Sequence, residues 1–517
     1  MGIRTYWTRR LRAWLDAGKK RTTCAPPVTL SGRLALNLQK IRADFAESSD
    51  LIIREADIGG RAAALVSIEG MILLQSFAQG VLNPLLQHDY GECTAEAQYV
   101  QMRDAVVALA EQTEVADFDA LYGMIMSGFC VILLDGVAQG LAVGMQGFSS
   151  RSVDEPTGET MQRGSREGFV EVIRTNLSMV RRRMKTPKLR FEMMSVGRES
   201  RTDVALCYLD GAVSAEILDR IRTRLRTCPL DDVLESGYLQ PYLEDQPLSL
   251  FSSVGTSERP DTVCGKIGEG RVAVFVDGTP DVLIVPYLFV EHFQSMDDYA
   301  NRPFFATLTR WIKYVAFAVA VLLPGTFVAM GTWQPSLFPT AMLYRLAESE
   351  ARQPFSLMGQ ALIIHFIYEL MREAGLRLPK PLGHAVSILG GLVIGDAAVE
   401  SGLIGSPMIL VVALTAISSF VIPKLYEPIA VLRLVFIVIG GVGTLFGMIV
   451  GFCALLSNLC ALCPYGVPYT APLSPLRLRG LRDVLIRSGW KRLGERRACV
   501  QQMPGSEVRP PKGGRSD

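Results

Sequence analysis

The sequence is short of charged residues and carries almost no net charge. It has 53 Lys and Arg against 51 Asp and Glu, a net charge of +2, and charged residues make up 20% of its 517 residues, where an ordinary globular domain has roughly 25%. A near-neutral chain is not suited to coating nucleic acid, so we expect no nucleic-acid partner. The deficit lies almost entirely in residues 311–463, which excludes a fully soluble enzyme.

Sequence motifs of catalysis and metal binding are also missing. The ten cysteines follow no repeated spacing, and the one close pair, Cys460 and Cys463, lacks the second pair or histidine that a zinc site needs. In residues 45–300 the only histidines are His88 and His292, and neither has a nucleophile–base setting. No Walker loop or dinucleotide-binding glycine pattern occurs. We therefore expect no enzyme, no catalytic residue, no metal and no cofactor.

Strand-like apolar runs that end in an acidic residue and a glycine occur four times. They are Arg61–Gly70, Phe129–Gly136, Thr202–Gly211 and Arg271–Gly278. The two glycines are 66 residues apart in the first pair and 67 apart in the second. Because glycine accommodates the positive φ of a tight turn, such an ending indicates a hairpin. We predict a duplicated α/β module, with one copy at residues 45–150 and the other at 190–300.

The rest of the chain divides by composition. We expect a basic N-terminal extension at 1–44, a polar linker with a basic helix at 151–189, a transmembrane helical domain at 301–470 and a basic cytoplasmic tail at 471–517. Within the linker, Arg181, Arg182 and Arg183 are adjacent, and three adjacent side chains of a helix point in different directions. This pattern fits either a solvated helix surface or contact with anionic headgroups or an acidic partner.

Four stretches meet the requirement of about 20 mostly apolar residues for a membrane-spanning helix. They are Trp311–Met330, Ala385–Ile404, Met408–Tyr426 and Leu434–Leu462. A fifth stretch, Phe355–Ala374, is ambiguous. The predicted fold class is thus an α/β cytoplasmic N-terminal region of two similar subdomains, followed by an α-helical transmembrane domain of four to five helical segments.

Basic residues set the expected orientation in the membrane. Residues 477–517 hold eleven Lys and Arg against four Asp and Glu, which favours the cytoplasmic side. The N-terminus has no apolar signal segment, so the soluble part is expected on the same side. Both ends on one side require an even number of crossings, and we therefore expect residues 355–374 to lie along the membrane or only dip into it.

Ionisable residues in the ambiguous stretch are candidates for an ion pathway. His365, Glu369 and Arg372 are spaced i, i+4 and i+7, which places them on one helix face, while the remaining residues are mainly Leu, Ile, Phe and Met. A polar stripe on an apolar helix can line a water-filled path. The alternative is an interfacial helix whose polar side is wet.

Asp396 and Glu400 form a second candidate group on one helix face. A carboxylate near the bilayer centre costs roughly 2.5–3.5 kcal/mol, so it needs a partner, water or an ion. Neutral oxygens of Thr415, Ser418 and Ser419 in the next apolar stretch could complete an ion pathway. The alternative is a structural polar cluster that joins helices.

Glycines recur at intervals that favour close helix packing. Gly443, Gly447 and Gly451 are four residues apart, and Gly391 and Gly395 repeat the spacing. In lipid, close backbone approach and packing drive helix association. We predict a tight helical bundle or an oligomer.

Several short motifs occur in one order along residues 35–475. They are Ser49-Asp50-Leu51 with Ile53-Arg54-Glu55, Arg163-Gly164 with Glu167–Phe169 and Arg174–Asn176, Arg182-Arg183 with Lys185–Pro187, Val276–Pro280 with Pro286, Phe293–Ser295 with Asp298-Tyr299, Pro379–Glu400, and Tyr465–Tyr469. With these motifs the chain resembles the GerA family of spore germination proteins, specifically the A subunit of germinant receptors. Asp396 departs from the family pattern, in which a neutral polar residue is expected, and this weakens a family-wide role for its carboxylate.

The resemblance implies a multi-pass protein of the spore inner membrane with both termini on the core side. Such A subunits work with a transporter-like B subunit and a lipoprotein C subunit. They are proposed to form an oligomeric, ligand-gated ion channel that releases cations and starts germination. We accordingly expect a homo-oligomer in membrane lipid. Two other interpretations stay open: a SpoVAF-like paralogue associated with the spore dipicolinic acid channel, and a solute transporter subunit.

Overall fold

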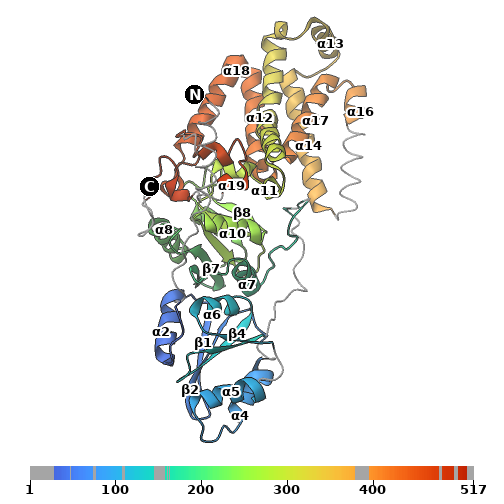
Figure 1. Ribbon diagram of the computed structural model, residues 1–517. Helices are drawn as coiled ribbons and strands as arrows, with labels where there is room; N and C mark the ends of the chain where they lie inside the picture. The colour runs from blue at the N-terminus through green and yellow to red at the C-terminus, as the bar shows by residue number, and fades with distance from the viewer. Residues whose placement is uncertain are drawn as a thin grey trace, which may run out of the picture. The chain divides into compact units, whose positions relative to one another are not determined.

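The computed structural model describes residues 28–46, 48–73, 77–106, 111–144, 158–159, 161, 163–378, 395–476, 480–493 and 499–508. These residues form two compact units. The first contains the described residues of 1–150 and 177–190, and the second contains those of 151–176 and 191–517. One five-stranded sheet lies in each unit, and the second unit also holds the long apolar helices (Figure 1).

The first sheet has the strand order β1-β2-β4-β5-β3, with antiparallel neighbours. Its strands are β1 (Leu51–Ile58), β2 (Arg61–Ile68), β3 (Gln112–Val115), β4 (Phe129–Leu134) and β5 (Gly140–Gly144). The accompanying helices are α2 (Leu34–Phe45), η1 (Ala78–Leu82), α4 (Asn83–Gln87), α5 (Ala95–Gln101), η2 (Met102–Val106) and α6 (Phe118–Ile125). Helices α2 and α6 cover one face of the sheet, and η1, α4 and α5 cover the other. Because both faces are covered, β4 is buried along its whole length, and this explains its continuous apolar run.

The second sheet repeats this topology in the order β6-β7-β9-β10-β8. Its strands are β6 (Leu189–Val196), β7 (Thr202–Leu209), β8 (Gly255–Ser257), β9 (Val272–Val276) and β10 (Val282–Val285). The helices are α7 (Ile173–Arg183), α8 (Ala215–Arg226), η4 (Ser236–Tyr238), α9 (Gln240–Leu243), α10 (Pro260–Gly268), η5 (Phe289–Phe293) and α11 (Asp297–Ala300). Two α/β subdomains of the same strand order are therefore present, as the four repeated runs predict.

Equivalent hydrogen bonds lie at the start of the first helix of each copy. Oδ1 of Asp135 accepts the backbone N–H of Leu34 at 2.9 Å, where α2 begins. In the second copy, Oδ1 of Asp277 accepts the backbone N–H of Ile173 at 3.0 Å, where α7 begins. Each carboxylate satisfies a free N–H at a helix N-terminus and interacts favourably with the helix dipole. In each copy the start of the helix before the first strand is thus bonded to the turn that follows β4 or β9.

The four predicted turns have the expected glycine geometry but not one common role. Gly70, Gly136, Gly211 and Gly278 have φ of 75°, 93°, 77° and 90°, values that glycine adopts readily. Gly136 and Gly278 lie in hairpins, since β4 pairs with β5 and β9 pairs with β10. Gly211 instead leads into α8, and the next described element after Gly70 is η1. The hairpin prediction is therefore wrong for the first turn of each copy.

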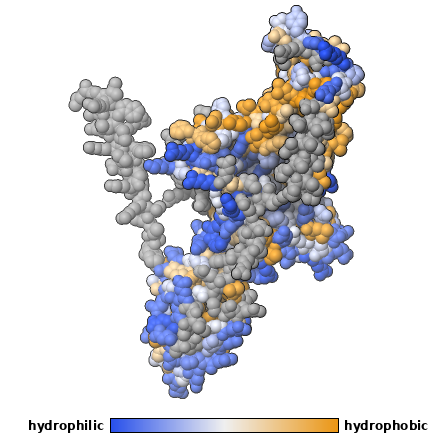
Figure 2. Space-filling view, turned by 90° about the vertical axis from the view of Figure 1, so that its right-hand side faces the viewer, coloured by the Kyte–Doolittle hydropathy of each residue, from blue (hydrophilic) through white to orange (hydrophobic). Residues whose placement is uncertain are grey.

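The helical part of the second unit follows α11. Its elements are α12 (Pro303–Trp333), η6 (Pro335–Leu337), α13 (Thr340–Glu350), α14 (Leu357–Arg377), α16 (Gly395–Glu400), α17 (Ser406–Phe420), η8 (Pro423–Leu425) and α18 (Tyr426–Ala461). On the face drawn in Figure 2, apolar side chains gather over this part.

Two of the described helical stretches, Pro303–Trp333 and Pro423–Ala461, are long and apolar enough to cross a membrane. They coincide with the first and fourth predicted spans. The bounds of the third predicted span, Met408–Tyr426, are wrong, because α17 has only 15 residues and ends at Phe420. Residues 385–394, which make up half of the second predicted span, lie outside the described residues.

The fourth predicted span needs a second correction, because α18 reverses within it. Thr444 has φ 64° and ψ −174°, which are not helical values. A Cβ on Gly451 would lie 3.1 Å from Cδ1 of Ile439, whereas twelve residues of straight helix span about 18 Å. Residues 426–443 and 445–461 are therefore two antiparallel segments. If each segment crosses the membrane, an even number of crossings no longer requires residues 355–374 to lie along the membrane.

The chain returns to the second sheet after α18. The remaining elements are η9 (Pro464–Gly466), η10 (Gly480–Asp483), α19 (Trp490–Leu493) and η11 (Val500–Gln502). Tyr465, Val467, Val484, Val500 and Val508 are buried in the same apolar cluster as the strands of that sheet. The described residues up to 508 therefore belong to the second subdomain, and a separate tail beginning at 471 is a wrong prediction for them.

Candidate functional site

The predicted polar face lies on α14, where this helix packs against α18. Ser356 begins the helix, and its Oγ accepts the backbone N–H of Gly359 at 3.3 Å. From Leu357 the helix runs without interruption for 21 residues. His365, Glu369 and Arg372 therefore share one face, as their spacing predicts.

The Glu369 carboxylate is the centre of an ionic cluster that joins two helices. It accepts a hydrogen bond from the Tyr426 hydroxyl at 2.8 Å and from Nε of Arg372 at 3.0 Å. Nη2 of Arg433 lies 3.3 Å from its Oε1. Tyr426 and Arg433 belong to the first segment of α18, so one carboxylate holds α14 and α18 together.

Arg433 is the most deeply buried charge of this cluster. Its side chain is 1% exposed, whereas that of Glu369 is 26% exposed. Its guanidinium lies over the ring of Tyr368, 5.6 Å from the centroid, and its Nη1 has no hydrogen-bond partner among the described residues. A buried charge that loses its only counter-charge is strongly destabilised. The charge of Arg433 therefore depends on Glu369.

His365 is on the same face but is not bonded to this cluster. It is buried, and its Nδ1 lies 2.8 Å from the carbonyl oxygen of Ala361. Its Nε2 has no hydrogen-bond partner among the described residues. The structure thus brings together Glu369 and Arg372 of the three predicted residues and leaves His365 one turn away.

The second predicted group is not assembled into a site by the described residues. Glu400 ends α16 with an exposed side chain, and the side chain of Asp396 lies outside the described residues. Thr415 and Ser419 are buried, but each hydroxyl donates to a carbonyl of its own helix, at 2.6 Å to Val411 and 2.9 Å to Thr415. Among the described residues, no group of three His, Cys, Asp or Glu could hold a metal ion.

The predicted packing glycines surround the reversal of α18. Cβ atoms on Gly443, Gly447 and Gly451 would meet Ile439 at 3.8, 3.4 and 3.1 Å. The tightest backbone contact is elsewhere, because a Cβ on Gly440 would lie 2.2 Å from the carbonyl oxygen of Gly325 in α12. Gly395 is the first residue of α16, and Gly391 lies outside the described residues.

A second set of ion pairs, which the sequence analysis missed, lies at the base of α12. The Arg310 guanidinium is fully buried and pairs with Asp298 at 2.8 Å and Asp483 at 3.0 Å. Lys313 lies 3.4 Å from Asp298. Arg310 is the one arginine of α12, which is mainly apolar, and it follows Asp298 of the Asp298-Tyr299 motif by twelve residues. Those two signals could have identified the pairing.

Buried charges of α10, η5 and the residue before β9 also meet in the second unit. Glu291 pairs with Arg271 at 2.6 Å and with Lys266. Burial alone raises the pKa of this carboxyl, but Arg271 and Lys266 outweigh burial and hold the pKa below its ordinary value. The neighbouring His292 lies 3.2 Å from the Tyr469 hydroxyl. Burial, assisted by the charge of Lys424, lowers the pKa of His292 to about 3, so the imidazole is neutral at physiological pH.

The arginines of the linker are not all solvated. Arg181 is fully buried in the first unit, where its guanidinium pairs with Asp50 at 2.8 Å. It also donates to the carbonyl oxygen of Thr186 at 3.1 Å. The interpretation of Arg181 as a surface or headgroup-binding residue is therefore wrong.

Comparisons with known proteins agree with the resemblance. The family model described as Bacillus/Clostridium GerA spore germination protein matches residues 39–499. Spore germination protein KA of Bacillus subtilis (strain 168) is 37% identical over 469 residues, covering 90% of this chain and 86% of that protein. The uncharacterized membrane protein YfkQ of the same organism is 36% identical over 464 residues, with coverage of 89% and 90%.

One solved structure also resembles this chain. It is the crystal structure of the N-terminal domain of the A subunit of the Bacillus megaterium spore germinant receptor GerK3. It is 34% identical in sequence, with a TM-score of 0.41, and the match covers 51% of this chain and 99% of that chain.

Proposed function

The chain belongs to the GerA family of spore germination proteins, and from this membership we propose that it is the A subunit of a nutrient germinant receptor in the spore inner membrane. In this role it acts with a transporter-like B subunit and a lipoprotein C subunit. Several copies of the chain would assemble, and their helices would form a ligand-gated pathway through which cations leave the spore core.

The ionic cluster around Glu369 supports a gating role. A carboxylate in contact with two arginines does not offer a free negative charge to a passing cation. It instead stabilises one arrangement of α14 against α18, which we name the closed arrangement. When a ligand on a partner subunit favours another arrangement, the equilibrium shifts by the difference in binding free energy between the two. The pair Glu369–Arg433 is then the contact that opening breaks.

The observation that carries this proposal is the unequal exposure of the pair. Arg433 is buried, while Glu369 reaches the edge of the buried region at 26% exposure. Separation of α14 from α18 would leave a buried guanidinium without a counter-charge, a cost of roughly 3–5 kcal/mol. A cost of this size keeps a gate shut without a ligand and can be overcome by ligand binding.

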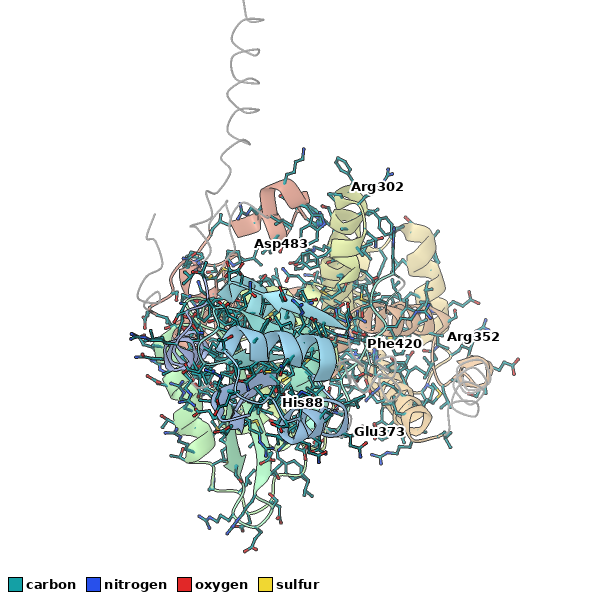
Figure 3. The ribbon with its side chains drawn as sticks, turned by 60° about the horizontal axis from the view of Figure 1, so that its bottom comes forward. His88, Arg302, Arg352, Glu373, Phe420 and Asp483 are labelled. Atoms are coloured by element: carbon teal, nitrogen blue, oxygen red, sulfur yellow. The ribbon has the colours of Figure 1, made fainter. Side chains whose placement is uncertain are left out.

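The experiment compares Glu369→Gln with Glu373→Gln in spores that carry the variant as their only copy of this chain. Glu373, labelled in Figure 3, is one turn further along α14 and has an exposed side chain at 49%. It pairs with the exposed Arg377 at 2.7 Å and lies 3.8 Å from Arg372. We expect Glu369→Gln to release potassium before any nutrient is added, because the closed arrangement is weakened. Glu373→Gln is expected to behave as the unmodified chain.

Protein level and membrane association are measured in the same spores. Unchanged release kinetics from Glu369→Gln, at normal protein level, would contradict a gating role for the cluster. Loss of the protein from the membrane would show that Glu369 is needed for assembly instead.

A further inference from the structure

One face of the first turns of α12 is apolar and exposed. Its six residues follow the helical period at i, i+1, i+4, i+7, i+8 and i+11. They are Phe304 (91% exposed), Phe305 (55%), Leu308 (57%), Trp311 (55%), Ile312 (51%) and Val315 (59%). We call these residues the α12 stripe. Apolar side chains of this size and number on one face do not remain in contact with water without a partner.

The opposite face of the same turns is polar and already occupied. Arg310 and Lys313 pair with Asp298 and Asp483 as described above, and Lys313 also donates to Oγ of Ser295 at 2.9 Å. The helix is therefore amphipathic here. Its charged side is bound to the second subdomain, and its apolar side faces away.

The C-terminal segment adds to the apolar side. Nε1 of Trp311 donates to the carbonyl oxygen of Leu485 at 3.0 Å, and the backbone N–H of Arg487 donates to Oγ1 of Thr307 at 3.1 Å. These bonds fix residues 485–488 beside α12. Ile486 and Trp490 of this segment are 58% and 62% exposed.

The length of α12 gives the depth of this surface. Trp311 and Trp333, both about half exposed, are 22 residues apart, which is about 33 Å along a helix. The hydrocarbon core of a bilayer is about 30 Å thick, and tryptophans concentrate at its two boundaries. If Trp333 lies at one boundary, Trp311 lies at the other, and residues 303–310 lie among the headgroups.

Positive charge next to the α12 stripe indicates that the headgroups it contacts are anionic. Arg302 and Lys491 are exposed and form no ion pair among the described residues. Figure 3 shows Arg302 at the end of α12, near the C-terminal segment that carries Asp483. The last 41 residues of the sequence also have an excess of basic residues. Basic residues beside an interfacial apolar face attract anionic lipids.

We propose that the α12 stripe, with Ile486 and Trp490, is a lipid-binding surface that lies at the membrane–water interface and binds anionic headgroups through Arg302 and Lys491. This inference rests on the membrane location proposed above. It places the base of α12, with its attached ion pairs, at a fixed depth in the bilayer.

The test uses the five tryptophans of the chain, Trp7, Trp14, Trp311, Trp333 and Trp490, as depth probes. The full chain is reconstituted in vesicles of phosphatidylglycerol and phosphatidylcholine that carry bromine near the glycerol backbone or near the end of the acyl chain. One variant keeps only Trp311 and has Phe at the other four positions. A second has Phe at all five and carries Phe304→Trp. Tyr238→Trp, in the soluble η4, is the water-exposed control, and a chain that keeps only Trp333 is the membrane control.

We expect bromine near the glycerol backbone to quench about half of the fluorescence of Trp311 and of Phe304→Trp, because this end of α12 lies at the boundary of the hydrocarbon core and among the headgroups. Bromine near the chain end should quench both less, and neither lipid should quench Tyr238→Trp. With Arg302 and Lys491 unmodified, bromine carried on phosphatidylglycerol should quench Trp311 more than bromine carried on phosphatidylcholine, and Arg302→Gln with Lys491→Gln should remove this difference.

Three results would overturn the proposal. If Trp333 is quenched by lipid but Trp311 and Phe304→Trp are not, the α12 stripe does not touch lipid. Protection of these two tryptophans from aqueous iodide would then show that a second copy or a partner protein covers the α12 stripe. Quenching of both by iodide would show that the stripe is exposed to water. If Trp333 is not quenched either, the membrane location fails, and the proposed function fails with it.

Discussion

At the scale of single residues, three buried arginines of the second unit each pair with a carboxylate. Arg271 pairs with Glu291, Arg310 with Asp298, and Arg433 with Glu369. Moving an ion out of water costs several kcal/mol, and the partner returns most of that cost only while it is ionised and in place. These arginines are therefore positions at which a change of one partner has a large effect.

Glu291→Gln is expected to destabilise the second subdomain by roughly 3 kcal/mol, because it leaves Arg271 and Lys266 buried with the partly exposed Glu269 as their remaining carboxylate partner among the described residues. Glu55→Gln removes the partner of Arg42 in an exposed pair and should cost less than about 1 kcal/mol. Thermal unfolding of the full chain in detergent, followed by circular dichroism, checks both. Equal midpoints for the two variants would contradict this account of Glu291.

His292 gives a prediction for pH. The pKa of the folded chain's imidazole is about 3, and that of the unfolded chain is near 6.5. Only the unfolded chain takes up this proton between those values, so the contribution to stability is complete above pH 6.5 and is lost as the pH falls toward 3. The side chain keeps some access to solvent, and we therefore expect a loss of about 1 kcal/mol between pH 7 and pH 5.

The non-titrating variant His292→Gln isolates this effect. Between pH 7 and pH 5, its free energy of unfolding should fall by about 1 kcal/mol less than that of the unmodified chain. If the two chains lose stability in parallel between pH 7 and pH 5, His292 is not the group responsible.

At the scale of elements, strands were easier to predict than helix ends. The strand β4 is a continuous apolar run closed by Asp-Gly, and both signals are local in sequence. The reversal at Thr444 was missed because both segments of α18 are apolar, and composition alone does not distinguish one long helix from two short ones. Gly443 was predicted to be a packing position, and it also lies directly before the turn at Thr444.

The contact between α12 and α18 predicts different outcomes for two neighbouring glycines. Gly440→Ala places a methyl group against the backbone of Gly325 and should destabilise the helical part by roughly 1–3 kcal/mol. Gly443→Ala meets only a side-chain methyl group of Ile439 at 3.8 Å and should be close to neutral. Resistance of the reconstituted chain to proteolysis measures the difference. A stable Gly440→Ala chain would show that the two backbones are not in contact.

The reversal of α18 predicts a crosslink. In a cysteine-free background, Ile439→Cys and Gly451→Cys should be joined within one chain by a short thiol-reactive crosslinker. In a straight helix these positions are about 18 Å apart and could not be joined by it. Ile439→Cys with Thr415→Cys, on a different helix, serves as the control. Mass spectrometry of the digested chain identifies the joined peptides. Absence of the 439–451 product would indicate that α18 is a single long helix.

At the scale of the whole molecule, the second subdomain is bound to both ends of the helical part. Arg310 near the start of α12 pairs with Asp298 and Asp483, and Tyr465 after α18 is buried in the core of the second sheet. The helical part therefore begins and ends on the same side, next to the second subdomain. That arrangement agrees with the predicted even number of crossings, which remains a prediction.

The candidate site could be predicted in part from the sequence. Glu369 and Arg372 stand out as charges in an apolar stretch, and their spacing places them on one face. Arg433 is an equally costly charge, and Tyr426 precedes it by seven residues, so the same spacing rule applied to α18 would have found the opposing face. The pairing of the two faces could not be predicted, because it depends on how α14 packs against α18.

The measurement that tests the central claim most directly is a double-mutant cycle on potassium efflux from vesicles that contain the full chain with its partner subunits. If the pair Glu369–Arg433 holds the closed arrangement, Glu369→Gln and Arg433→Gln should each raise unstimulated efflux by at least tenfold, because the proposed cost of breaking the pair, roughly 3–5 kcal/mol, exceeds the 1.4 kcal/mol of a tenfold change. The double variant should then leak no more than either single variant, because both remove one interaction. A double variant whose efflux is the product of the two single effects, or the absence of any effect, would contradict the claim.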